Sequence, residues 1–159
     1  MKILAIDPGY ERLGIAILEK NKSDKKEKLL YSDCFKTSAK IPFCERLVLI
    51  GDQIEKIIEI YKPAALSIET LFITNNQKTA MHVAEARGVI IYEASRAGLS
   101  VSEYTPLQVK LATTGHGSGD KKQIIKMLPN LISLNKEIRH DDEYDAIALG
   151  ITYFAYNKI

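Results

Sequence analysis

The sequence predicts an α/β domain in which helices cover both faces of a mixed five-stranded sheet. Three apolar segments joined by short polar connections come first, which is typical of an antiparallel meander. Two further apolar segments then alternate with helical patterns, so the order of elements is that of one α/β domain. At 159 residues, with 46% hydrophobic and 26% charged residues, the chain fits a single domain over residues 1–159.

The first three strands are predicted at Lys2–Asp7, Leu13–Glu19 and Leu29–Thr37. Pro8-Gly9 supplies a turn after the first strand. The nearly all-charged segment Lys20–Lys28 has the composition of a solvated hairpin tip between the second and third strands.

An amphipathic helix is predicted to open at Pro42 and to end before Pro63, because proline cannot continue a helical ladder. Its apolar positions recur at helical spacing and are Leu47, Ile50, Ile54, Ile57, Ile58 and Tyr61. The apolar segment Ala64–Glu69 follows as a fourth strand that ends on a carboxylate.

The second half of the chain begins with a polar, irregular stretch at Thr70–Asn76. An alanine-rich helix is predicted over Gln77–Ala97, and Gly98 stands at a favourable position to end it. Val101–Tyr104 is the fifth predicted strand.

Three helices are expected after the fifth strand. Thr105-Pro106 combines an N-cap residue with a proline in the first turn, which starts the first of them. The glycine-containing loop Gly115–Gly119 separates it from a lysine-bearing helix at Lys121–Leu128. The last helix is predicted from about Asp142 to Tyr156.

Composition excludes several classes of protein. The apolar run Ile3–Ile6 stops at Asp7 and is too short for a signal peptide. No stretch approaches the roughly 20 apolar residues that cross a bilayer, so a cytoplasmic protein without membrane partners is expected. Cys34 and Cys44 lack metal-ligand spacing, which indicates reduced thiols. The net charge of +2 neither requires nor excludes nucleic acid.

Four acids stand where a catalytic site could form. Asp7 and Glu69 each end a predicted strand, and functional groups gather at such edges of α/β sheets. Asp142 and Asp145 lie three residues apart at the start of the last helix and share one face. Each acid alone could equally serve in a turn or as a helix cap. Glu69 is harder to explain this way, because an acid that ends a core strand needs a cation.

Phosphodiester hydrolysis explains why several acids would gather. The reaction needs an activated water and a stabilised leaving oxygen, and two Mg²⁺ ions roughly 4 Å apart supply both. Hard cations prefer carboxylate oxygens from different elements of a fold. The acids Asp7, Glu69, Asp142 and Asp145 are therefore predicted as metal ligands and catalytic residues of a nuclease.

Six segments of the chain resemble, in order and at compatible spacing, the RuvC family of Holliday junction resolvases. They are Ile6–Gly14, Ile68–Phe72, Glu85–Gly88, Tyr104–Lys110, Gly115–Ile124 and His140–Thr152. The resemblance implies an RNase H-like fold and a homodimer. It also implies paired symmetric nicks in four-way DNA junctions during recombination and repair. Mg²⁺ is the implied cofactor, with Mn²⁺ as a substitute, and the RuvA–RuvB branch-migration complex is an implied partner.

The same resemblance assigns site residues. The family's four catalytic acids fall on Asp7, Glu69, Asp142 and Asp145, and its DNA contacts fall on Phe72, Lys110 and Lys121. Two departures stand out. The loop Thr74–Asn76 lacks the lysine common there in the family, and Asp141 adds an acid that could compete with Asp142 as a ligand. His140, beside these acids, could tune a water or a ligand.

Two other functions share part of the pattern. Sugar kinases and actin-like ATPases also open with a strand, an Asp-x-Gly turn and a strand, but they need a second nucleotide-binding domain. A non-catalytic junction-binding module is the other alternative. Four intact acids argue against it, because a pure binder gains nothing from negative charge near phosphate. ATP turnover would favour the first alternative, and binding without cutting would favour the second.

Overall fold

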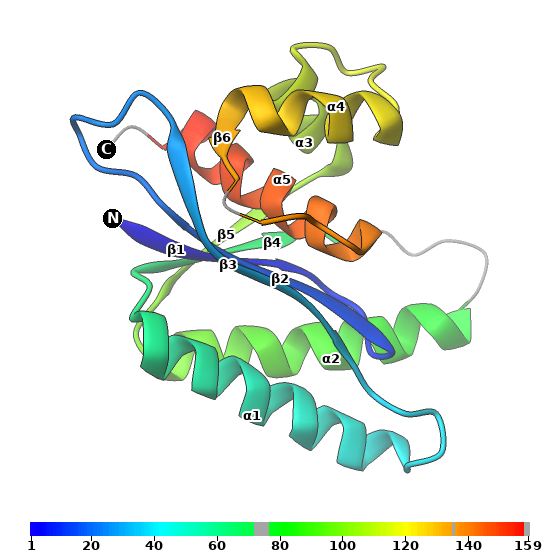
Figure 1. The fold of residues 1–159 in the computed structure, drawn as a ribbon. Coiled ribbons are helices and arrows are strands. Elements are labelled where there is room, and N and C mark those ends of the chain that lie inside the picture. The colour runs from blue at the N-terminus through cyan, green and yellow to red at the C-terminus, as the bar shows by residue number, and fades with distance from the viewer. Residues whose placement is uncertain (72–76, 135, 158–159) are drawn as a thin grey trace.

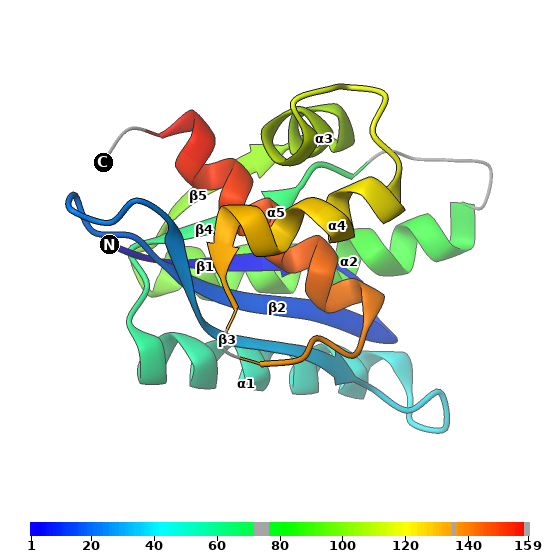
Figure 2. The same cartoon turned by 45° about the horizontal axis from the view of Figure 1, so that its top comes forward.

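The computed structural model describes residues 1–71, 77–134 and 136–157, with the side chains of 77 and 78 excepted. Five helices and a mixed sheet make up this part of the chain. Helices α1 and α2 cover one face of the sheet, and α5 lies on the other face with α3 and α4 packed over it (Figure 1). The turned view shows α5 running across the strands beneath α4 (Figure 2).

The sheet has six strands in the order β5-β4-β1-β2-β3-β6. In chain order they are β1 (Lys2–Asp7), β2 (Arg12–Glu19), β3 (Glu27–Lys36), β4 (Ala65–Glu69), β5 (Ser100–Tyr104) and β6 (Ile132–Ser133). The meander β1–β2–β3 is antiparallel, whereas β4, β5 and β6 pair in parallel with their neighbours. The mixed α/β sheet is confirmed, but the predicted number of strands was one too low. β6 was missed because two residues cannot display an alternating pattern.

The helices are α1 (Phe43–Tyr61), α2 (Gln77–Arg96), α3 (Pro106–Thr114), α4 (Lys121–Leu131) and α5 (Asp141–Tyr156). Most boundaries fall within one or two residues of their predicted positions. α4 runs three residues beyond its predicted end because Pro129 is accommodated inside the helix rather than ending it. None of the helices within the described ranges is both long and apolar enough to span a membrane. Both cysteines are free thiols, as predicted, with Cys34 buried and Cys44 exposed.

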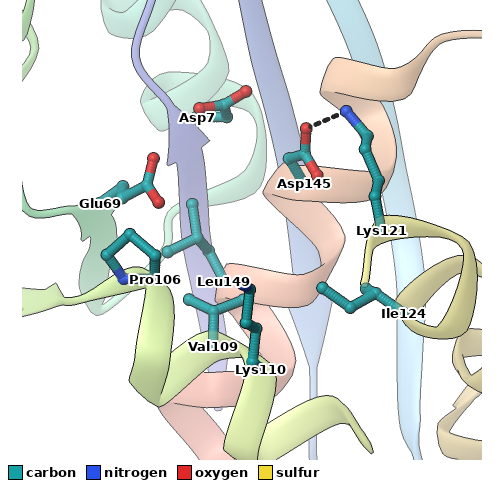
Figure 3. Close-up of a pocket in the computed structure, with 9 residues that line it drawn as sticks. All are labelled: Asp7, Glu69, Pro106, Val109, Lys110, Lys121, Ile124, Asp145 and Leu149. Atoms are coloured by element: carbon teal, nitrogen blue, oxygen red, sulfur yellow. Dashed lines mark hydrogen bonds and ion pairs between the residues drawn. The ribbon is translucent and has the colours of Figure 1, made fainter. Parts of the chain in front are cut away.

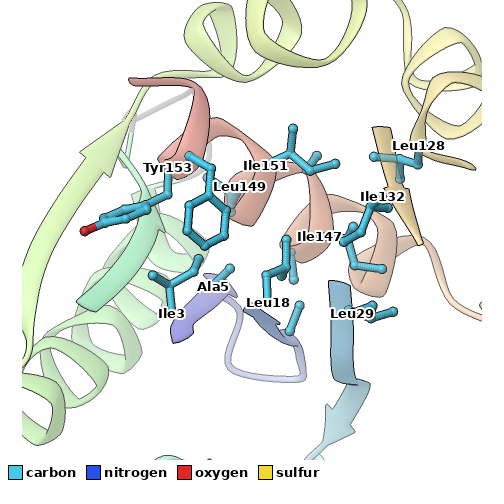
Figure 4. Close-up of a cluster of buried hydrophobic side chains, with 14 of the residues drawn as sticks. Ile3, Ala5, Leu18, Leu29, Leu128, Ile132, Ile147, Leu149, Ile151 and Tyr153 are labelled. Carbon is cyan, nitrogen blue, oxygen red and sulfur yellow. The ribbon is translucent and has the colours of Figure 1, made fainter. Parts of the chain in front are cut away.

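β1 divides the interior into two cores because successive side chains of a strand point to opposite faces. Leu4 and Ile6 pack with α1 and α2, whereas Ile3 and Ala5 pack with α5 (Figure 4). Every one of these four side chains is fully buried. The apolar segment Ile3–Ile6 therefore lies in a central strand of the sheet.

α5 lies close to the sheet because small residues face it. A Cβ atom at Gly150 would collide with the side chain of Leu18 on β2. Ser67 of β4 is fully buried and donates a hydrogen bond of 2.8 Å to the carbonyl oxygen of Leu149. With α3 and α4 on its outer side, α5 is buried over most of residues 146–154. Its first turn is thereby fixed next to the ends of β1 and β2.

Candidate active site

Two of the predicted acids lie side by side at one edge of the sheet. Asp7 ends β1 and Glu69 ends β4, and these strands run in parallel with Ile6 opposite Ile68. The next residue of each strand therefore emerges at the same edge. The first turn of α5 brings further acids to this edge from the helix side.

Gly14 allows α5 to approach the strands this closely. It lies opposite Asp7 in the register of β1 and β2. A Cβ atom at Gly14 would overlap the backbone carbonyl oxygen of Asp142 and would lie 3.1 Å from the Cβ of Asp7. Only glycine fits between them, so the close approach of the helix and the strand is built into the backbone.

Three of the four predicted acids line one pocket of about 310 Å³ (Figure 3). Asp7 and Glu69 enter it from the strands, and Asp145 enters it from α5. The remaining lining residues come mainly from α3 and α4 and are Pro106, Val109, Lys110, Lys121, Ile124 and Leu149. The pocket is thus lined by carboxylates, lysines and apolar side chains.

Burial and mutual repulsion make these carboxylates hard to ionise. Burial raises the pKa of Asp7 to about 7, and the nearby charges of Asp145, Glu69 and Asp142 add to the effect. Burial, followed by the charge of Asp145, also raises the pKa of Glu69. The pKa of Asp145 is raised by burial as well, against the opposing effect of Lys121. A bound cation, or protonation of one or more of these carboxylates, therefore stabilises the cluster.

Lys121 supplies positive charge at the α4 side of the pocket. Its Nζ atom lies 2.8 Å from the carboxylate of Asp145 (Figure 3). The same atom lies 3.5 Å from the carboxylate of Asp141. The Asp141 side chain is largely exposed and does not line the pocket. Lys110 lines the pocket from α3. Both lysines predicted to contact DNA thus border the acids.

Asp142 lies near these acids but does not line the pocket. Its carboxylate forms an ion pair with Arg12 and accepts a hydrogen bond of 3.4 Å from the thiol of Cys34. Burial acts to raise its pKa, but its own backbone N–H, Cys34 and Arg12 together hold the pKa below its usual value. The four predicted acids are therefore divided, with three in the pocket and one held by a guanidinium beside it.

Arg87 fixes the position of Glu69. Its Nε atom donates a hydrogen bond of 3.1 Å to the backbone carbonyl of Glu69, and its guanidinium pairs with Glu103 of β5. The motif that contains Arg87 was recognised in the sequence, but no role was assigned to it. Arg12 and Cys34 were also missed. No sequence signal links them to Asp142, which lies more than 100 residues away.

One acid of the last helix has a structural role. Glu143 is buried and accepts a hydrogen bond of 2.8 Å from the hydroxyl of Ser32. It also pairs with Lys136 at 2.7 Å. Since these partners satisfy its charge, Glu143 fastens α5 to β3 and takes no part in the pocket.

The oxygen donors at this edge have the chemistry that a hard divalent cation requires. Asp7, Glu69 and Asp145 are carboxylates from three elements, and their mutual repulsion is relieved by a cation. Within the described ranges, however, no three His, Cys, Asp or Glu side chains are close enough together to hold a metal ion as they stand. Asp145 and Asp142 are turned toward Lys121 and Arg12. These carboxylates therefore suit a divalent metal ion, but two of them are paired with cationic side chains in this structure.

The lysines are placed by well-defined helix ends. Thr105 caps α3 and Asp120 caps α4, each with a reciprocal hydrogen-bonded capping box. Lys110 and Lys121 follow on these helices, so α3 and α4 set their positions beside the pocket. The third predicted DNA contact, Phe72, and the altered loop Thr74–Asn76 lie outside the described residues.

The three histidines occupy different surroundings. Nε2 of His140, the residue before α5, lies 3.3 Å from Nζ of Lys36. The Nδ1 atom of His116 donates to the carbonyl of Thr114 at 2.8 Å. His82 stacks on Phe43 with ring centroids 4.0 Å apart. His140 is thus the histidine whose ring contacts a cation at the edge of the acids.

The family model described as crossover junction endodeoxyribonuclease RuvC matches residues 3–153. The chain belongs to this family. Crossover junction endodeoxyribonuclease RuvC from Thermosipho melanesiensis is 42% identical over 150 residues, which cover 94% of each chain. The protein of the same name from Moorella thermoacetica is 39% identical and covers 98% of this chain and 92% of its own.

A solved structure agrees with this assignment. The structure of T. thermophilus RuvC in complex with a Holliday junction substrate superposes with a TM-score of 0.91 at 30% identity, over 98% of this chain and 94% of that one. The predicted RNase H-like fold is confirmed. The ATPase alternative is set aside, because one family model accounts for nearly the whole chain.

Replacing Asp7 by Asn is expected to stabilise the metal-free fold at pH 8. The pKa of Asp7 is about 7 in the folded state, above its ordinary value of 3.8. The parent therefore loses stability relative to Asp7→Asn as the pH rises from 4 to 7, by about 1.4 kcal/mol for each unit of pKa difference.

Urea unfolding in EDTA at several pH values measures this effect. The stability advantage of Asp7→Asn should be greatest at pH 8 and should vanish below about pH 4, where both folded and unfolded states carry the proton. An advantage that does not change between pH 4 and pH 8 would show that the Asp7 carboxylate is not destabilised in the fold.

Proposed function

We propose that this chain, acting as a single nuclease domain over residues 1–159, resolves four-way DNA junctions by Mg²⁺-dependent hydrolysis. The observation that carries the proposal is the pocket lined by Asp7, Glu69 and Asp145, in which burial and neighbouring carboxylates raise the pKa of all three acids. Such a cluster is unfavourable for a pure phosphate binder, because it repels the ligand. It is favourable for a hydrolase that needs divalent cations beside the scissile phosphate.

Each acid has a proposed part in this chemistry. Bound Mg²⁺ or Mn²⁺ would supply Lewis-acid activation of the phosphodiester and of a water molecule. Asp7, at the centre of the cluster, would contact two ions, with Glu69 and Asp145 holding one ion each. Asp142 would become the fourth acidic metal ligand once its carboxylate leaves Arg12. The backbone contact from Arg87 keeps Glu69 in place throughout.

Junction DNA is the proposed substrate because the related T. thermophilus RuvC has been solved in complex with a Holliday junction substrate. Lys110 and Lys121 would neutralise backbone phosphates on the α3–α4 side of the acids, which gives affinity without base readout. Phe72 follows Glu69 closely in the sequence and would stack on an unpaired base near the crossover.

A homodimer is proposed because two symmetric nicks require two active sites. α2 offers a surface for it. Met81 and Tyr92 are 63% and 62% exposed, the highest values among the exposed large apolar side chains of the described residues. They lie eleven residues apart, so they share one face with Gly88 between them. Two α2 helices could pack closely there, since Gly88 carries no side chain.

The remaining parts of the proposal come from the family resemblance. The RuvA–RuvB branch-migration complex would deliver the junction, and the reaction would take place in the cytoplasm. Hydrolysis of the junction requires neither the RuvA–RuvB complex nor this location.

Cleavage of a synthetic four-way junction tests the proposed activity. The parent should give paired symmetric nicks with Mg²⁺, and Glu69→Gln should reduce the rate by roughly 10²–10³ while junction binding persists. Glu59→Gln is the matched control, because Glu59 is exposed on α1, on the opposite face of the sheet.

The other outcomes separate the alternatives. Binding without nicks in Mg²⁺ and Mn²⁺, over several junction sequences, would identify a junction-binding module. A chain that neither binds nor cuts junctions would refute the proposed substrate. Equal loss of activity in Glu59→Gln would show that the effect of Glu69→Gln is not specific to the pocket.

The dimer surface is tested by placing a charge on α2. Met81→Glu and Tyr92→Glu should convert the parent dimer into monomers in sedimentation velocity, because each introduces like charges across a two-fold interface. Ile60→Glu is the control on α1, where the side chain is similarly exposed at 59%. A monomeric parent, or α2 variants that stay dimeric, would contradict this assignment.

A further inference from the structure

The pairing of β2 with β3 places two cations side by side next to the acids. Arg12 and Lys36 are direct partners in the antiparallel register, so their side chains lie on the same face of the sheet. That face is the one covered by α5, because Arg12 contacts Asp142 and Lys36 contacts His140. Both cationic side chains are exposed.

This arrangement is unfavourable without an anion, since like charges directly opposite each other on a sheet repel. Arg12 has the carboxylate of Asp142 as a partner. Lys36 contacts only a ring nitrogen of His140 at 3.3 Å, and no ion pair joins it to a carboxylate within the described residues. Of the two adjacent cations, Arg12 has an acid as its partner and Lys36 has none within the described residues, and that acid is itself a proposed metal ligand.

The pair comes from other elements of the fold than the lysines already described. Lys110 and Lys121 project from α3 and α4, whereas Arg12 and Lys36 stand on the ends of β2 and β3 beside the start of α5. Cationic side chains from the helices and from the strands therefore border the acids. A nucleic-acid backbone that crosses the acids would meet both groups of cations.

We propose that Arg12 and Lys36 form a binding site for a backbone phosphate of the cut strand, on the β2–β3 side of the scissile phosphate. The inference rests on the proposed function, because it requires DNA to lie across the acidic pocket. A phosphate gives Lys36 the anion that it lacks, and the guanidinium of Arg12 can bind the same phosphate through two parallel hydrogen bonds. As Arg12 turns to the phosphate, Asp142 loses its ion-pair partner and becomes available to the other acids.

The salt dependence of junction binding tests the site without requiring cleavage. Binding is measured by fluorescence anisotropy in EDTA over a range of salt concentrations, with the parent, Lys36→Ala and Arg12→Ala. Each lost phosphate contact should reduce the slope of log K against log salt by about 0.9. Lys26→Ala is the matched control, because Lys26 is an exposed lysine in the hairpin at the far end of the same two strands.

A second measurement locates the contact. Single phosphates around the cleavage position are replaced one at a time by neutral methylphosphonates. One replacement should weaken binding by the parent and by Lys26→Ala, but should have a smaller effect on Lys36→Ala, in which Arg12 alone faces that phosphate. Urea unfolding of each variant ensures that a loss of affinity is not a loss of folding.

The outcomes distinguish this inference from the proposed function. If the parent binds junctions but Lys36→Ala and Arg12→Ala have the slope of Lys26→Ala, the phosphate site is wrong and the proposed function stands. If every phosphate replacement affects Lys36→Ala as much as the parent, the site is likewise wrong. If the parent does not bind junction DNA at all, both proposals fail together.

Discussion

The close approach of α5 to the ends of β1 and β2 is the constraint on which the site depends. Gly14 provides the room, because any side chain there would overlap the backbone of Asp142. The helix brings Asp145 to the edge where Asp7 and Glu69 already end their strands. Three carboxylates are thereby brought together in one pocket, where burial and then the charges of the neighbouring acids raise the pKa of Asp7.

Cationic side chains around the pocket offset this repulsion. Lys121 pairs with Asp145, and Arg12 pairs with Asp142. The same cations suit the phosphates of a DNA strand, so under the proposed function DNA, metal and side chains would compete for the same charged groups. Binding of DNA and of metal should therefore be coupled, because each releases partners that the other needs. Arg87 donates a hydrogen bond to the backbone carbonyl of Glu69 and thereby fixes the end of β4.

Much of this architecture could be predicted from the sequence because it depends on local patterns. The apolar run of β1, the Thr105 cap and the acids at strand ends each carry their signal within a few residues. β6 could not be predicted, since its two residues form a strand only through pairing with β3. The ion pair of Asp142 with Arg12 could not be predicted either, because the two residues meet only after folding brings β2 next to α5.

Calorimetric titration of Mg²⁺ or Mn²⁺ at pH 7, in buffers of different ionisation enthalpy, tests the central claim most directly. If Asp7, Glu69 and Asp145 hold the cation, the parent should bind it and release protons, because Asp7 has a pKa of about 7 and must lose its proton to become a ligand. Asp7→Asn should lose both the binding and the proton release. Equal metal affinity and equal proton release in the parent and in Asp7→Asn would contradict the account.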